Sequence, residues 1–341
     1  MDRRRILIIG RNGQVGWELR RTLAPLGGVV AIDFPEIDLT DGSSVRRWLT
    51  ETRPALVVNA AAYTAVDRAE SEPEKCHLIN AVAPGILAQE ARKLDALLVH
   101  YSTDYVFDGA KAGGGGYLED DPTRPLGVYG RSKLAGDLAV LEAGGRHLIF
   151  RLCWVYGTRG QNFLLTIMRL AREREKLRVV RDQVGCPTWS RMIAEATALA
   201  VQQTLAAPDP AAFTGLYHLA ASGRTSWHGF AEAIVSAMPP EGRKCTGVEP
   251  IATAEYPTAA KRPAFSVLCC DKLKRTFGLQ LPDWHESLLA ALDVEREPPL
   301  AVARVSAASP QPALSPGGPE GPRSGPEPLR TGDGRGGTST P

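Results

Sequence analysis

Long apolar runs, C-x-x-C pairs and an excess of one charge are all missing from this 341-residue sequence. Forty Lys and Arg residues stand against 38 Asp and Glu residues, so the net charge is only +2. That balance excludes proteins that bind nucleic acid through bulk positive charge. No apolar stretch approaches the roughly 20 residues that a membrane helix needs. We therefore expect neither nucleic acid nor a membrane as a partner.

The six cysteines and the first residues bear on the cellular location. Most of the cysteines lie in apolar or mixed segments and give no sign of a disulfide framework. The basic start, Met1 to Arg5, is followed by an apolar run that stops at Gly10, too short for the core of a signal peptide. We expect a reduced protein of the cytoplasm.

Short β-branched runs alternate with segments of helical period through the first half of the chain. The expected strands are 6–9, 29–32, 56–58, 96–101 and 147–152, and the expected helices are 17–26, 45–52, 74–94 and 129–141. The strands are apolar nearly throughout, as burial on both faces requires. The pattern predicts an α/β protein with a Rossmann-type, doubly wound parallel sheet.

The second half of the chain has a looser rhythm, with an expected helix at 163–176, a strand at 178–181 and a helix at 190–204. We expect an NAD(P)-binding Rossmann domain at 1–157, which shares later segments, and a smaller, mainly substrate-binding domain at 158–297. Residues 298–341 are rich in Pro, Gly and Ser without apolar periodicity, which predicts a disordered tail.

Three glycines, Gly10, Gly13 and Gly16, follow the first expected strand and open the first expected helix. Glycines at such a turn allow backbone to approach a pyrophosphate, and the helix N-terminus offers free N–H groups to the anion. The spacing G-x-x-G-x-x-G alone is weak and is also compatible with a plain turn. The strand before it and the helix after it favour a dinucleotide site.

Two residues give conflicting indications about which nicotinamide cofactor binds. Asp33, at the end of the second expected strand, suits the ribose diol of NAD and repels a 2′-phosphate. Arg11, inside the glycine turn, suits the 2′-phosphate of NADP, although it is also compatible with an ordinary solvated side chain. We expect NADPH as the cofactor, with NADH also accepted.

A tyrosine and a lysine four residues apart, Tyr129 and Lys133, lie on one face of an expected helix. A nearby ammonium lowers the pKa of a phenol toward working pH, which suits a general acid. Thr103 follows the fourth expected strand, where open α/β sheets bind ligands. Each signal is weak, but glycine turn, strand-end hydroxyl and Y-x-x-x-K in this order favour a reductase. The histidines His100, His218 and His228 lack metal-ligand spacing and are predicted to be packed or surface residues.

With these motifs the sequence resembles the extended short-chain dehydrogenase/reductase family, and most closely its branch that reduces dTDP-4-dehydrorhamnose. The resemblance covers residues 1 to about 296. Its segments are GRNGQVGWEL (10–19), VVNAAAYTAVDRAESEP (57–73), VHYSTDYVFDG (99–109), PLGVYGRSKLAGD (125–137), RLCWVYG (151–157), NFLLTIMRLA (162–171), DQVGCPT (182–188), GLYHLAASG (215–223), EYPTAAKRP (255–263) and LPDWHESL (281–288).

The resemblance implies NAD(P)H-dependent reduction of the C4 ketone of dTDP-4-dehydro-β-L-rhamnose to dTDP-β-L-rhamnose. It implies that Thr103 polarises the ketone, that Tyr129 donates the proton, and that Lys133 lowers the tyrosine pKa and holds the nicotinamide ribose. The implied cofactor contacts are Gly10, Arg11, Asn12, Gly13, Gln14, Val15, Gly16, Asp33, Asp38, Leu39, Ala61, Ala62, Tyr63, Asn80, Tyr129 and Lys133. The implied substrate contacts are Thr103, Asp104, Val106, Tyr129, Trp154, Asn162, Phe163, Gln183 and Arg262.

Two other functions stay open: a different 4-ketoreductase of nucleotide deoxysugars, and a cofactor-binding regulatory protein like the β subunit of methionine adenosyltransferase. Some of the resembling reductases dimerise through carboxylates that share Mg²⁺. Here Glu18 keeps one such position, but Arg191 stands at another, and a guanidinium repels a cation. We expect no metal site, an Arg191–Glu18 ion pair in its place, and a monomer or weak homodimer.

Overall fold

Six parallel strands form the central sheet of the computed structural model, which describes residues 4–111 and 113–296. In spatial order the strands are β10 (Gly215–His218), β5 (His147–Leu152), β4 (Leu97–Thr103), β3 (Leu56–Asn59), β1 (Arg5–Ile9) and β2 (Gly28–Ile32). Every neighbouring pair is parallel. The order reverses direction at β1, so the carboxyl ends of β1 and β3 flank a switch point where such sheets bind ligands. The predicted Rossmann-type α/β fold is confirmed.

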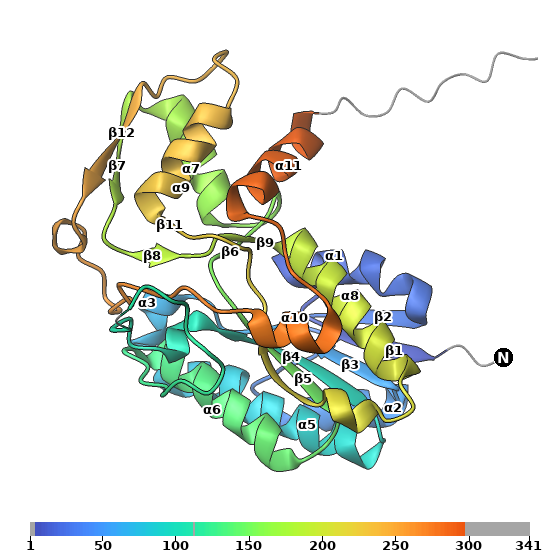
Figure 1. Ribbon diagram of the computed structural model, residues 1–341. Helices are drawn as coiled ribbons and strands as arrows, with labels where there is room; N and C mark the ends of the chain where they lie inside the picture. The colour runs from blue at the N-terminus through green and yellow to red at the C-terminus, as the bar shows by residue number, and fades with distance from the viewer. Residues whose placement is uncertain (1–3, 112, 297–341) are drawn as a thin grey trace, which may run out of the picture. The chain divides into compact units, whose positions relative to one another are not determined.

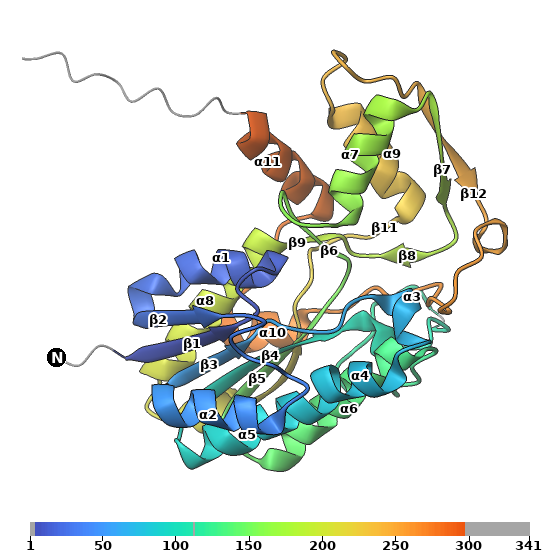
Figure 2. The same cartoon turned by 180° about the vertical axis from the view of Figure 1, so that it is seen from behind.

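Helices cover both faces of this sheet (Figures 1 and 2). Alternate residues of a strand point to opposite faces, so Ile6 and Ile8 pack toward one helix layer and Leu7 and Ile9 toward the other. The first layer is α1 (Gln14–Thr22), α8 (Ser190–Ala206) and α10 (Asp271–Phe277), and the second is α2 (Gly42–Thr52), α5 (Ala83–Lys93) and α6 (Val128–Ala143). Burial on both faces explains why the strands are apolar without alternation.

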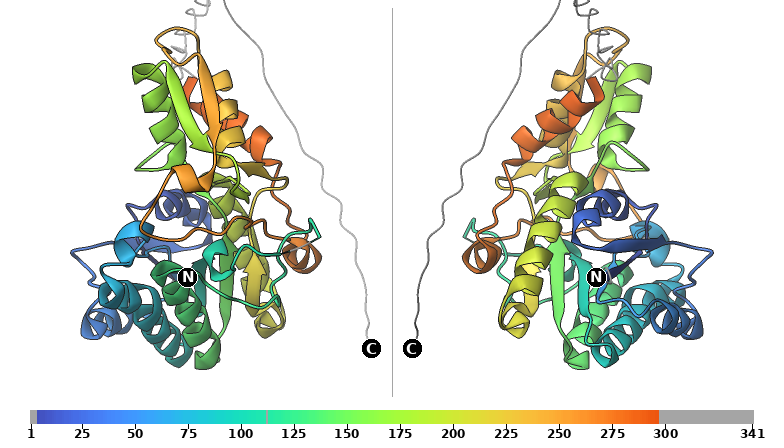
Figure 3. Two further views of the ribbon diagram at one scale, coloured as in Figure 1. Left: turned by 90° about the vertical axis from the view of Figure 1, so that its left-hand side faces the viewer. Right: turned by 90° about the vertical axis from the view of Figure 1, so that its right-hand side faces the viewer.

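A separate apolar core lies beyond the carboxyl ends of the strands. It contains α7 (Phe163–Glu173), α9 (Trp227–Ala237), α11 (Trp284–Arg296) and the parallel pair β7 (Lys176–Val180) and β12 (Gly247–Ile251). In Figure 3 these green-to-orange segments stand together, apart from the blue N-terminal strands. Short pairs connect the two cores: β6 (Val155–Tyr156) with β9 (Thr188–Trp189), and β8 (Val184–Gly185) with β11 (Thr225–Ser226).

The helix expected at 17–26 ends at Thr22 and is followed by a short 3-10 turn, and two further expected helices also differ from the structure. The helix expected at 74–94 is α4 (Pro73–His77), a π-helical turn η2 (Leu78–Val82) and α5, preceded by the short α3 (Val66–Ala69). The helix expected at 163–176 ends at Glu173, because Arg174 is extended and Lys176 already pairs with β12. The remaining short helices are η1 (Ala24–Leu26), η3 (Asp104–Val106), η4 (Pro210–Phe213) and η5 (Thr253–Glu255).

The described residues belong to one compact unit, and β10, α8 and α10 return from the second half of the chain to the central sheet. The division into two domains near residue 157 therefore stays a prediction. The tail predicted at 298–341 lies outside the described residues. Within the described part of the chain, every helix is too short or too polar to cross a membrane.

Candidate active site

A cleft of about 810 Å³ opens at the carboxyl ends of the central strands and gathers most of the predicted site residues. The predicted residues that line it are Gly10, Asn12, Gly13, Gln14, Val15, Asp33, Ala61, Ala62, Thr103, Asp104, Tyr129, Lys133, Trp154, Asn162, Phe163 and Arg262. Those predicted residues that are not part of the lining are Arg11, Gly16, Asp38, Leu39, Tyr63, Asn80, Val106 and Gln183. The cleft thus unites the glycine turn with the Tyr129–Lys133 helix, as the sequence predicts.

The glycine turn has the shape that a pyrophosphate requires. Gly10 has φ +91°, and a Cβ there would lie 2.6 Å from the backbone N of Ala61. A Cβ on Gly16 would meet the carbonyl oxygen of Gly10 at 1.9 Å, so this glycine lets α1 pack against the turn. A Cβ on Gly13 would lie 3.4 Å from that oxygen and otherwise face the cleft. Since no described side chain caps α1 at Gly13, its first N–H groups can bind an anion.

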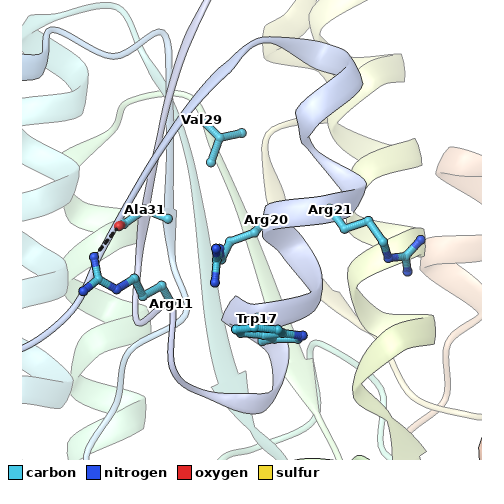
Figure 4. Close-up of a pocket in the computed structure, with 6 residues that line it drawn as sticks. All are labelled: Arg11, Trp17, Arg20, Arg21, Val29 and Ala31. Atoms are coloured by element: carbon cyan, nitrogen blue, oxygen red, sulfur yellow. Dashed lines mark hydrogen bonds between the residues drawn. The ribbon is translucent and has the colours of Figure 1, made fainter.

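The two residues with conflicting cofactor preferences are both engaged by protein groups. Asp33 accepts hydrogen bonds from the backbone N–H of Asn12 at 2.9 Å and of Phe34 at 2.8 Å. Arg11 pairs with Glu36 at 2.9 Å and donates to the Ala31 carbonyl at 3.0 Å. Figure 4 shows that Arg11 lies in a neighbouring hollow, with Trp17, Arg20, Arg21, Val29 and Ala31. Asp33 therefore faces the cleft, and Arg11 lies beside it.

Lys133 is held deep in the sheet side of the cleft, where its side chain is only 2% exposed. Its Nζ donates to the carbonyl oxygen of Tyr101 at 2.6 Å and lies 3.4 Å from Nε2 of His100. Burial lowers the pKa of Lys133 to about 8, while the carboxylate of Asp137 acts in the opposite direction. The ammonium is thus retained at neutral pH.

Tyr129 lines the same wall, with its ring edge-on to that of Tyr105. Poor solvation raises the pKa of Tyr129 well above its usual value, and a hydrogen bond with Thr103 opposes this shift. The expectation was a pKa lowered by Lys133, and here the direction is the opposite. The reason is that burial disfavours the phenolate, while the Lys133 ammonium is engaged by Tyr101 and His100. A phenol with a raised pKa is fully protonated at neutral pH, as a proton donor must be.

Thr103 has a buried carboxyl neighbour. Its hydroxyl donates to Oδ1 of Asp104 at 3.0 Å and accepts from the backbone N–H of Tyr105 at 3.2 Å. Burial raises the pKa of Asp104 to about 6, against hydrogen bonds from Ser266, Cys153 and Thr103. While Asp104 is ionised, Thr103 donates its hydrogen bond to that carboxylate and presents lone pairs to the cleft.

The opposite wall of the cleft is aromatic. Trp154 and Trp227 stack with ring centroids 3.6 Å apart, and Phe163 packs against Trp227 at 4.6 Å. Trp154 has φ +43°, unusual for a bulky residue, and Gly185 lies against its ring. Gln183 lies behind this wall and accepts a hydrogen bond from the Trp227 indole at 3.2 Å. Trp227 was not predicted as a site residue, because its position, 73 residues after Trp154, carries no motif.

Two polar residues of this wall are tied to neighbouring elements. Asn162 caps α7 by accepting from the Leu165 N–H, and its amide donates to Gln14 Oε1 of the glycine turn at 2.9 Å. Arg262 pairs with Asp67 at 2.8 Å. Both nevertheless line the cleft and are placed to contact a bound ligand.

The predicted residues away from the lining have other partners. Tyr63 and Asn80 bond to one another, and the Asn80 amide also donates to Ser132 of α6. Asp38 accepts from Thr40, and Leu39 packs against the core below the sheet. Val106 is fully buried among Phe107 and its neighbours, which does not favour direct contact with a substrate.

The surface of α1 and α8 contains the expected ion pair. Nε of Arg191 lies 3.4 Å from Oε2 of Glu18, and Arg21 bridges Glu18 and Glu195 at 3.3 Å each. Within residues 4–111 and 113–296, no cluster of three or more His, Cys, Asp and Glu side chains is arranged to hold a metal ion. The carboxylate of Glu18 is thus compensated by arginines.

Comparison with known proteins agrees with this geometry. The profile of the RmlD substrate binding domain family matches residues 4–296. The dTDP-4-dehydrorhamnose reductase of Burkholderia thailandensis is 50% identical over 286 residues, which cover 82% of this chain and 95% of that protein. That of Escherichia coli K12 is 47% identical over 289 residues, covering 82% and 94%. The crystal structure of the Bacillus anthracis enzyme in complex with NADP superposes with a TM-score of 0.78 at 35% identity, covering 85% of this chain and 99% of that one. The chain therefore belongs to the RmlD substrate binding domain family, together with these dTDP-4-dehydrorhamnose reductases.

Proposed function

We propose that this protein reduces the C4 ketone of dTDP-4-dehydro-β-L-rhamnose with NADPH to give dTDP-β-L-rhamnose. The observation that carries the proposal is the cleft that brings Thr103, Tyr129 and Lys133 together with the glycine turn. Relatives with up to 50% identity bear the name of this activity, and a related structure holds NADP. Bound NADPH supplies the hydride that adds to C4.

Tyr129 donates the proton that the developing alkoxide at C4 requires. Its raised pKa keeps the phenol protonated, and Tyr129 lines the cleft together with Thr103. The Lys133 ammonium, retained by Tyr101 and His100, places a positive charge behind the oxygen that becomes negative. Thr103 can donate a hydrogen bond to the ketone when Asp104 is protonated and its hydroxyl no longer donates to that carboxyl group.

The glycine turn and the aromatic wall bind the two reactants. The free N–H groups of α1 hold the cofactor pyrophosphate, while Trp154, Phe163 and Trp227 offer flat apolar surface to the nucleotide sugar. Arg262 offers its planar guanidinium to the diphosphate of the substrate. This assignment treats residues up to about 157 as mainly cofactor-binding and the later ones as mainly substrate-binding.

One reconstitution tests the function. The protein is incubated with dTDP-glucose, the two preceding pathway enzymes and NADPH, and the sugar nucleotide is identified by mass spectrometry and NMR. dTDP-β-L-rhamnose supports the proposal. A C4 epimer or another deoxysugar would indicate a different 4-ketoreductase, and NADPH binding without any product would indicate a regulatory protein.

The state of assembly is part of the same proposal. We infer a monomer or weak homodimer that does not depend on Mg²⁺, because two arginines occupy the surroundings of Glu18. Glu18 is buried, and its arginine partners belong to the same chain, so these ion pairs stabilise the protomer and do not join two copies. Sedimentation with Mg²⁺ and with EDTA tests this inference, and a dimer that dissociates on chelation would contradict it. A cytoplasmic location is proposed on the six free thiols, and cell fractionation tests it.

A further inference from the structure

We propose that His100 is a positioning residue for the reaction: its Nε2 holds the Lys133 ammonium from behind, so that one N–H of Lys133 points into the cleft. The expected effect on turnover rests on the proposed function. The expected effect on NADPH binding rests only on the geometry of the cofactor side of the cleft. From the sequence, His100 is predicted only to be a packed or surface histidine. Its side chain is fully buried on β4, between the helix that carries Lys133 and the end of β3.

The hydrogens of the ammonium can be counted. Lys133 has three N–H donors. One points to the Tyr101 carbonyl at 2.6 Å, and a second points to Nε2 of His100 at 3.4 Å. The third N–H can point into the cleft, because Lys133 is one of the residues that line it. Two acceptors on the protein side therefore fix the direction of the one donor that can reach a ribose hydroxyl.

The tautomer of His100 follows from its two neighbours. For Nε2 to accept from the ammonium, the ring proton must be on Nδ1, which then needs an acceptor. The amide nitrogen Nδ2 of Asn59 lies 3.2 Å from Nδ1 of His100. In this orientation Oδ1 of Asn59 is buried without a hydrogen-bond partner among the described residues. A half-turn of the Asn59 amide exchanges its oxygen and nitrogen, so that Oδ1 accepts from Nδ1–H of His100. The other tautomer would direct an N–H at a positive charge.

The electrostatics of the surrounding elements agree with a neutral imidazole. Burial and the charge of Lys133 hold the pKa of His100 well below its usual value. Two further titratable groups act on Lys133: Asp137, on the same helix α6, and Cys76, on α4. Asp137 is itself paired with Arg151 on β5 at 3.2 Å. His100 therefore stays an acceptor for the ammonium across the working range of pH.

The predicted consequence is a shift in the titration of Lys133. An acceptor on the charged form stabilises it, so loss of the imidazole lowers the pKa of Lys133 further. The test measures NADPH affinity by fluorescence from about pH 6 to pH 10, a range that brackets the lysine titration. Wild type, His100→Leu and His100→Gln are compared, because glutamine retains an oxygen acceptor and leucine has none. In His100→Leu the alkaline loss of affinity should move to lower pH by about one unit.

His218 provides the matched control. It is an equally buried histidine, bonded to the Tyr117 carbonyl and packed on Phe107 away from the cleft. His218→Leu should lower the melting temperature without moving the alkaline limb. His100→Gln should keep the wild-type limb and most of the wild-type kcat/KM, whereas His100→Leu should lose about tenfold or more in kcat/KM near pH 8.

The inference is overturned if His100→Leu keeps the wild-type pH dependence of NADPH binding. It is equally overturned if His100→Gln behaves like His100→Leu, or if His218→Leu shifts the limb as much. If the wild type binds NADPH but yields no dTDP-β-L-rhamnose, the proposed function fails while the binding titrations still decide the role of His100.

Discussion

The two walls of the cleft are built in different ways. The wall of Thr103, Tyr129 and Lys133 is polar, lies on the sheet and α6, and is fixed by hydrogen bonds to buried backbone and side chains. The wall of Trp154, Phe163 and Trp227 is aromatic and is held by ring stacking. It brings the remote Trp227 against two residues that are close in the sequence. The first wall is suited to move a proton and the second to hold a ligand. Substitutions should therefore affect kcat on one side and KM on the other.

The largest effect is expected for Tyr129→Phe. The change removes only the proton donor, so kcat should fall by about 10²- to 10⁴-fold. The dissociation constant for NADPH, measured by fluorescence, should stay within about threefold of wild type, since the ring is retained. Turnover close to wild type would show that another group donates the proton and that the polar wall has a different function.

Lys133→Met should be less selective. Loss of the ammonium removes charge stabilisation and the donor that faces the cleft, so kcat should fall by about 10²-fold and NADPH should bind more weakly. Steady-state rates and NADPH titrations at one pH measure both. Tight NADPH binding in this variant would contradict a role of Lys133 at the ribose. A circular dichroism spectrum like that of wild type is the control for folding.

Trp227→Leu tests the aromatic wall. Loss of the stack with Trp154 and Phe163 should raise KM for the dTDP-sugar about tenfold, because aromatic pairs contribute about 0.5–1.5 kcal/mol beyond area burial. kcat should change by less than about threefold. Trp227→Phe keeps a ring and is the matched control. A loss confined to kcat would contradict the division of labour between the two walls.

The smallest effect is expected for Arg11→Ala, at the edge of the cleft. KM for NADPH should rise by about fivefold while KM for NADH changes little, because only NADPH carries a 2′-phosphate. Glu36→Gln releases Arg11 from its ion pair and should change the preference in the opposite direction. Initial rates with both cofactors measure this. Equal effects on the two cofactors would show that Arg11 does not contact the phosphate.

The sequence predicted the polar wall better than the aromatic one, for a physical reason. A glycine turn, a strand-end hydroxyl and a tyrosine–lysine pair each lie within a short segment, so local spacing indicates them. Trp227 reaches Trp154 only because α9 and the loop after β5 meet in the fold, and no local pattern encodes that contact. The end of α7 at Glu173 was missed likewise, because pairing of β7 with β12 overrides a helical pattern.

The backbone and the side chain of Trp154 act on stability in opposite directions. A bulky side chain at φ +43° costs on the order of 1–3 kcal/mol, which glycine at the same place would not incur. The indole, however, is half of the stacked pair that faces the ligand. That indole is also nearly buried, and truncating a buried tryptophan costs about 3–5 kcal/mol, which exceeds the backbone strain. A Trp154→Gly variant, although freed of the backbone strain, should therefore unfold at a lower temperature than the wild type.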